Sequence, residues 1–140
     1  MVQNWFEDVK GVRPSMPLHL TVIHDQLAIC RLPAGVDVPA WADDGGFSSV
    51  TRTPEETSVV CREANVPEAL AAERGWRAVR VRGPLDFGMT GVVAALVQPL
   101  AEARIPVFVL STYDTDYLLV PSRHLDAALD ALAAAGHTVQ

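Results

Sequence analysis

The first half of the chain alternates short apolar runs with turn-forming residues, a pattern typical of β-strands joined by short connections. The apolar runs cover residues 18–23, 27–32, 47–52 and 57–61. Proline and glycine after the second run predict a loop with at most a short helix over 40–42. Pro67 is acceptable in the first turn of a helix and Gly75 has the position of a C-cap, so residues 67–74 are predicted to be helical. Residues 1–17 hold two prolines and no sustained period, and they are predicted to form an N-terminal arm.

The second half of the chain shows clearer helical periods and predicts a strand–helix–strand–strand–helix–strand order. The apolar stripes of the two helices are Val92, Val93, Leu96, Val97 and Leu100, and then Leu125, Ala128, Leu129 and Leu132. Thr90 and Ser122 precede these stripes as candidate N-caps. The strands are predicted over 76–81, 106–111, 115–120 and 137–139. This order is the split βαβ, ferredoxin-like arrangement.

An internal repeat relates the two halves of the chain. A shift of 59 positions lays Val50–Cys61 on Val109–Val120, and each copy reads as a hairpin turn between two strands. In this alignment Asp116 has no acidic counterpart, because it falls on Thr57. The chain is therefore predicted to hold two related units over residues 18–75 and 76–140. The first unit is a trimmed copy with a reduced leading helix.

Composition and charge exclude several classes of partner. The chain has 140 residues, of which 49% are hydrophobic, so it can bury a real core. Its 17 acidic and 11 basic residues give a net charge of -6. With no basic run, the chain is not expected to bind nucleic acid. No apolar segment is long enough for a membrane span, and no secretory signal pattern is visible, so a cytoplasmic location is expected.

The residue types that usually carry catalysis or bind metals show no organised pattern. Cys30 and Cys61 lie in strand-like runs without CxxC spacing, which favours buried thiols over a disulfide or a metal pair. The 4 histidines lack ligand spacing, and no Ser/His/Asp set can be assembled. The Asp86-Phe87-Gly88 triplet has none of the other motifs of a kinase around it. The sequence therefore predicts no metal, no cofactor and no enzyme activity.

Two stretches carry a family resemblance: GPLDFGMTG at residues 83–91 and STYDTDYLLV at 111–120. Together with the intervening helix they resemble the small tandem ACT-domain proteins, relatives of the ACT regions of aspartate kinases and of cytosolic arginine sensors. The resemblance covers about residues 18–140. It implies an α+β fold of two tandem ferredoxin-like (βαββαβ) units that bind a small regulatory ligand, commonly an amino acid, without catalysis. It also implies ligand contacts at Met89, Thr90, Gly91, Val92, Thr112, Tyr113 and Asp116.

The chemistry of the same residues is complementary to an amino acid. The loop over 87–91 leads into a helix whose first N–H groups have no intrahelical partner, so they form a seat for a carboxylate. Asp116 can pair with an ammonium group through a charge-assisted hydrogen bond. Ser111 and Thr112 can add neutral hydrogen bonds, while Tyr113 can cover the site.

Several alternatives stay open from the sequence. Gly88 and Gly91 are equally suited to a tight strand-to-helix turn, and Asp116 to an edge strand that faces water. The arginine sensors carry an acidic residue where this chain has Met89, so a neutral or smaller side chain competes with a guanidinium group as the ligand. A structural pairing module that has lost its ligand is the alternative function. An exposed edge near strand 115–120 also suggests a homodimer.

Overall fold

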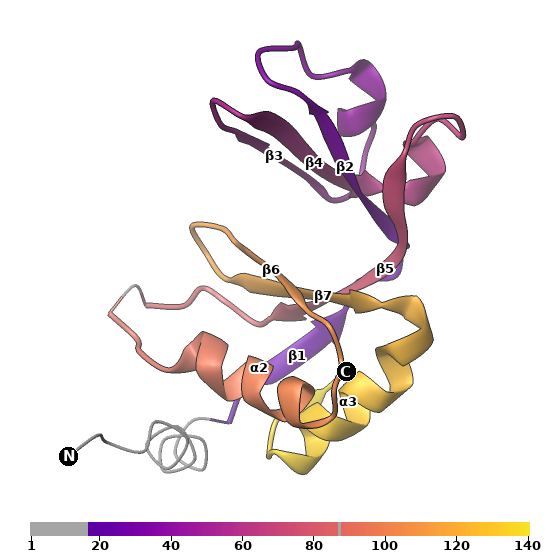
Figure 1. Cartoon of the computed structure of the whole chain (residues 1–140). Helices are drawn as coiled ribbons and strands as arrows, with labels where there is room; N and C mark the ends of the chain where they lie inside the picture. Colours follow the sequence, from indigo (N-terminus) through magenta and orange to yellow (C-terminus); the bar gives the residue numbers. More distant parts are fainter. Residues whose placement is uncertain (1–16, 87) are drawn as a thin grey trace, which may run out of the picture. The chain divides into compact units, whose positions relative to one another are not determined.

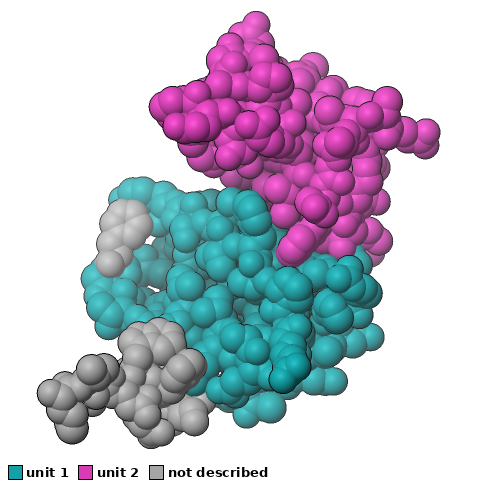
Figure 2. Space-filling model, viewed as in Figure 1, with its two compact units in different colours: residues 1–23, 78–140 teal, residues 24–77 magenta. Residues whose placement is uncertain are grey.

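The computed structural model describes residues 17–86 and 88–140, and the chain divides into two compact units (Figure 1). Of the described residues, unit 1 comprises 17–23, 78–86 and 88–140, and unit 2 comprises 24–77 (Figure 2). The arm predicted for residues 1–17 lies, apart from its last residue, outside the described residues. None of the described helices reaches the length and apolar character that a bilayer crossing requires.

Unit 2 is a four-stranded antiparallel sheet with two short 3-10 turns. Its elements are β2 (Leu27–Pro33), η2 (Ala40–Asp43), β3 (Ser48–Arg52), β4 (Glu56–Arg62), η3 (Glu63–Asn65) and the first part of β5 (Ala72–Val81). The strand order is β3-β4-β2-β5. This is the ferredoxin-like order in which both crossover helices have shrunk to single turns. The reduced helix predicted for this unit is therefore matched by η2.

The helix predicted over residues 67–74 is wrong. The Leu70 N–H donates to the Pro67 carbonyl at 3.0 Å, which closes one turn only. Ala72 already belongs to β5 and pairs with β2. Gly75, at φ +76°, lies where the β2–β5 register shifts, so the glycine serves a β-bulge and not a helix C-cap. Pairing across the sheet outweighs the local helical preference here, and it cannot be read from a short window of sequence.

Two cysteines lie in the core of unit 2. Cys30 on β2 and Cys61 on β4 are free, buried and hydrogen-bonded to each other. Burial raises the pKa of both thiols, and for Cys61 the pKa rises to about 11 with a further contribution from the neighbouring Cys30. These are the buried thiols that the sequence predicts, and no described residues group into a metal-binding cluster.

We expect these thiols to be unreactive in the folded protein. Because the pKa of both thiols is raised, the reactive thiolate of each is scarce near pH 8, and the Cys61 thiolate becomes abundant only as the pH approaches 11. Alkylation of the native protein at pH 8 should therefore proceed only at the rate at which unit 2 opens. The same reagent should label both cysteines rapidly in denaturant. Rapid labelling under native conditions, measured by intact mass, would contradict this prediction.

Unit 1 is a five-stranded sheet with two helices on one face (Figure 1). Its elements are β1 (His19–Val22), the second part of β5, α2 (Val92–Glu102), β6 (Phe108–Ser111), β7 (Asp116–Pro121), η4 (Ser122–His124), α3 (Leu125–Ala134) and β8 (Thr138–Val139). The strand order is β6-β7-β5-β1-β8, with β1 antiparallel to β5 and parallel to β8. The element order predicted from residue 76 onward is confirmed, and so is the α+β, ferredoxin-like class.

The first strand is placed differently from the sequence-based division of the chain. The division puts residues 18–23 in the first unit, but β1 pairs with β5 and β8 inside unit 1. The ten-residue strand β5 belongs partly to each unit. Its first part is the fourth strand of unit 2, and its second part is the first strand of the ferredoxin-like order in unit 1. Strand β1 then takes the fourth position of unit 1, next to β5.

Both predicted helix caps in unit 1 are wrong. The N-cap of α2 is Gly91 at φ +78°, not Thr90, and no side chain caps the helix. Glycine adopts this left-handed conformation without strain, which lets the loop turn sharply into the helix. Ser122 begins the turn η4 instead of capping α3, whose N-cap is His124.

The internal repeat is confirmed by the register of the two hairpins. Arg52 pairs with Thr57 across the β3–β4 turn, and Ser111 pairs with Asp116 across the β6–β7 turn. The turns also match, because the Thr53 N–H donates to the Glu56 carbonyl at 2.9 Å and the Thr112 N–H donates to the Thr115 carbonyl at 2.8 Å. Residues at equivalent positions of the two hairpins are 59 positions apart, which is the shift found in the sequence.

Candidate functional site

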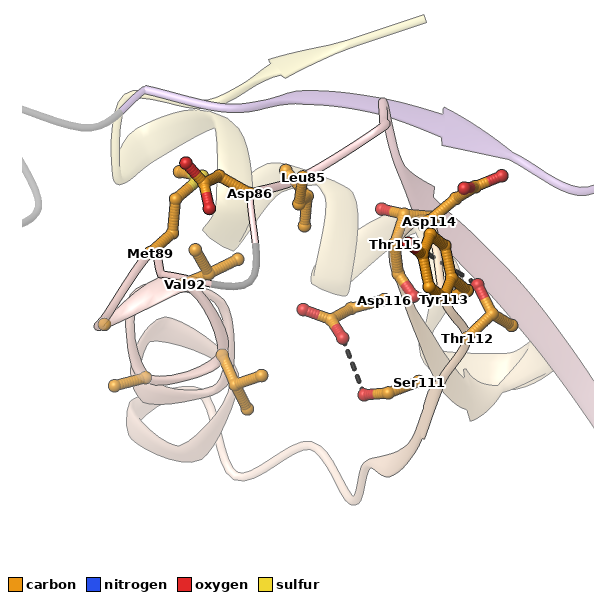
Figure 3. A pocket seen from close by; sticks show the side chains of 13 residues that line it. Leu85, Asp86, Met89, Val92, Ser111, Thr112, Tyr113, Asp114, Thr115 and Asp116 are labelled. Atoms are coloured by element: carbon orange, nitrogen blue, oxygen red, sulfur yellow. Dashed lines mark hydrogen bonds between the residues drawn. The ribbon is translucent and has the colours of Figure 1, made fainter.

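A cavity of about 360 Å³ in unit 1 lies between the start of α2 and the β6–β7 hairpin (Figure 3). Its lining residues are Leu85, Asp86, Met89, Gly91, Val92, Val93, Ala94, Ser111, Thr112, Tyr113, Asp114, Thr115 and Asp116. The volume falls at the small end of the range of about 300–1,000 Å³ that is typical of ligand pockets. The cavity can therefore hold a small metabolite.

The cavity brings together seven of the eight residues that the sequence singles out. These are Met89, Gly91, Val92, Ser111, Thr112, Tyr113 and Asp116. Thr90 does not line the cavity, although both of its neighbours do. Six lining residues were missed. Val93 and Ala94 could have been found, because they belong to the same first helical turn as Val92, whereas Leu85 and Asp86 reach the cavity only through the path of the loop.

Asp116 is the half-buried acid of this cavity. Its Oδ1 accepts a hydrogen bond from the Ser111 hydroxyl at 2.6 Å, and no other described residue hydrogen-bonds this carboxylate. In Figure 3 the carboxylate points from β7 into the space in front of α2. Its second oxygen is therefore available to a ligand, and a cationic donor is the partner that a carboxylate binds most strongly.

The other two aspartates of the cavity have different surroundings. Asp86 Oδ1 accepts the Gly88 N–H at 2.8 Å, the short-range bond of an Asx turn. Asp114 is exposed, and its side chain points away from Asp116 in Figure 3. Both side chains belong to turns at the rim. Asp116 alone carries its charge into the interior of the cavity.

The start of α2 forms the wall opposite the hairpin. The Ala95 N–H makes the first helical bond, to the Gly91 carbonyl at 2.9 Å. The N–H groups of the three preceding residues, Val92, Val93 and Ala94, therefore have no acceptor within the helix, and no side chain caps them. These residues line the cavity, so the positive end of the helix dipole lies at its wall. An anionic group is favoured there.

Three contacts tie residues 81–85, which precede α2, to the turn of the β6–β7 hairpin. The Leu85 N–H donates to the Asp114 carbonyl at 2.7 Å. The buried Thr115 hydroxyl donates to the Val81 carbonyl at 2.6 Å. At Gly83 an added Cβ would lie 2.9 Å from the Asp114 carbonyl oxygen, so only glycine permits this approach. The loop before α2 is thereby tied to the turn that carries the acids.

The equivalent hairpin of unit 2 carries different residues at the positions of Asp116 and Ser111. Thr57 takes the place of Asp116 and is fully buried. Arg52 takes the place of Ser111 and donates through Nη1 to the Val36 carbonyl at 2.8 Å. Val36 and Val38 pack over the core of this unit. Where unit 1 has a carboxylate facing a cavity, unit 2 has a buried threonine.

The fold and the cavity together define a ferredoxin-like domain with a cavity of small-molecule size beside its first helix. Comparison with known proteins shows which family this domain is similar to. A family model described as the ACT domain matches residues 71–134, and a model for an N-terminal domain matches residues 25–69. Residues 71–134 of this chain are therefore an ACT domain.

Three relatives show how far the similarity extends. A crystal structure of protein Atu0741 from Agobacterium tumefaciens is 40% identical, with a TM-score of 0.84 over 89% of this chain and 93% of that one. The cytosolic arginine sensor for mTORC1 subunit 1 from Bos taurus is 32% identical over 98 residues, which are 62% of this chain. This chain spans only 30% of that sensor's length. The regulatory subunit of aspartate kinase from Thermus thermophilus shares the fold, with a TM-score of 0.57 at 14% identity over 83% of this chain and 96% of that one.

Proposed function

We propose that this protein is a regulatory module that binds a free amino acid in the cavity of unit 1. The observation that carries the proposal is the open oxygen of Asp116, which faces the uncapped start of α2 across a small cavity. An amino acid presents an ammonium and a carboxylate on one carbon atom. Partners of opposite charge on two facing walls are the arrangement that such a molecule requires.

The binding mode follows from these partners. The ligand ammonium donates to the second carboxylate oxygen of Asp116, and the ligand carboxylate accepts from the N–H groups of Val92, Val93 and Ala94. The hydroxyls of Ser111 and Thr112 stand on the hairpin side of the cavity. Tyr113 is 81% exposed, so it is available to cover the entrance when a ligand is present.

The proposal does not include catalysis. Among the described residues, the ionisable side chains that line the cavity are three aspartates and Tyr113, with no histidine, lysine or cysteine. No acid and base with separated roles face each other there. The names of the relatives, an arginine sensor and an aspartate kinase regulatory subunit, support a sensing role. The word cytosolic in the sensor's name supports a cytoplasmic location.

We expect at least one of the twenty standard amino acids to raise the melting temperature of the purified protein at millimolar concentration. A ligand that binds only the folded state stabilises it by mass action, by about 2.7 kcal/mol at one hundred times its dissociation constant. The measurement is a thermal-shift panel, with each hit confirmed by calorimetry. Flat responses to all twenty compounds would favour the structural pairing module instead.

A further inference from the structure

We infer that the side chain of the bound amino acid is uncharged and aliphatic. This inference rests on the proposed function and concerns the part of the cavity that the ligand's ammonium and carboxylate leave unfilled. Three properties of the lining carry it: the number of free acids, the absence of basic residues and the position of the apolar side chains.

The interior of the cavity holds one acid, and the ligand ammonium uses it. A lysine or arginine ligand would bring a second cation that needs a second buried partner. Asp86 is exposed and already accepts the Gly88 N–H, and the exposed Asp114 points away from Asp116 (Figure 3). Neither acid offers a charge to the interior. A cationic side chain would therefore lose hydration there without gaining an ion pair.

An acidic side chain is disfavoured even more strongly. The described lining of the cavity contains three aspartates and no lysine, arginine or histidine. A second ligand carboxylate would enter a cavity that already holds the Asp116 carboxylate, and no cationic side chain of the described lining would pair with it. The seat at the start of α2 can hold one carboxylate, and the α-carboxylate of the ligand occupies it.

Apolar side chains form the rest of the wall. Val92 and Met89 lie together on the helix side of the cavity, and Leu85 lies to the right of them in the close-up view (Figure 3). Met89 and Val93 are 39% and 37% exposed, so part of each apolar side chain is open to solvent. An aliphatic ligand side chain would cover this apolar surface and gain by removing it from water. The methionine side chain is flexible, so it can adjust to the branching of the ligand.

The direct test is calorimetry of the full chain with leucine, isoleucine, valine and methionine against lysine, arginine, aspartate and glutamate. We expect the best aliphatic ligand to bind about tenfold or more tightly than any charged one. If lysine, arginine, aspartate or glutamate binds most tightly, this inference is overturned while the proposed function stands. If none of the standard amino acids binds, the proposed function itself fails.

A variant in the apolar wall provides a second test. Met89→Asp adds a carboxylate where the wall is apolar, so it should weaken the best aliphatic ligand about tenfold and raise the affinity for lysine or arginine. Val50→Asp is the matched control, because Val50 is also 39% exposed but lies on β3 of unit 2. It should leave the ranking of ligands unchanged. An unchanged ranking in Met89→Asp would show that this wall does not contact the ligand side chain and would overturn the inference.

Discussion

Asp116→Asn is expected to lower the affinity for the amino acid ligand by about tenfold to one hundredfold. Asparagine keeps the shape of the side chain, and its carbonyl oxygen can still accept the Ser111 hydroxyl. An amide NH2 group replaces the second carboxylate oxygen. This group is a donor, so the ligand ammonium loses its acceptor at this position. Loss of one hydrogen bond to a charged group is worth about 1.5 to 3 kcal/mol, which corresponds to this range of affinity. Calorimetry of the variant with the ligand found in the panel gives the result.

The control for this variant lies two residues away in the same turn. Asp114→Asn removes the same charge from an exposed side chain that points away from Asp116, and the Asp114 carbonyl that binds Leu85 is unaffected. We expect neither the affinity nor the melting temperature to change appreciably. If Asp114→Asn abolished binding and Asp116→Asn did not, the roles given to the two acids would be reversed. If both variants bound normally, the ammonium would have to bind elsewhere.

The features that local sequence patterns could predict are those fixed by short periods. The alternation of apolar residues and the 59-residue shift define both hairpins, because a strand slipped by one residue would turn its apolar face to water. The helix α2 follows from its apolar stripe in the same way. These elements account for most of the cavity, since the start of α2 and the β6–β7 turn supply its two walls.

The features that the sequence could not predict depend on pairing between distant segments. The helix predicted over 67–74 is lost because β5 extends back to pair with β2, and the bulge at Gly75 exists only in that pairing. The partner of β1 is likewise invisible in a local window. The rim of the cavity at Leu85 is set by its bond to the Asp114 carbonyl, a contact across 29 positions of sequence that no motif records.

His137→Leu is expected to destabilise unit 1 more than any other single polar substitution proposed here. The Leu18 N–H donates to His137 Nδ1 at 3.1 Å, and Nε2 lies 3.3 Å from the Ala95 carbonyl. Because Nδ1 accepts, the ring proton lies on Nε2, which donates to that carbonyl. Pro99 has no N–H for the Ala95 carbonyl, so the histidine supplies the donor that the helix lacks.

Leucine would fill much of the same volume but leave both backbone groups buried without their partner. Each buried unsatisfied group costs about 1 to 3 kcal/mol, so we expect a loss of about 2 to 6 kcal/mol in the free energy of unfolding. Urea unfolding followed by circular dichroism measures it. His19→Leu is the control, because His19 is exposed and should change stability by less than about 0.5 kcal/mol. Equal stability of the two variants would mean that water or a backbone shift satisfies Leu18 and Ala95. A loss confined to His137→Leu would instead show that α2, whose first turn holds Ala95 and forms the wall of the cavity, depends on a histidine from the far end of the chain.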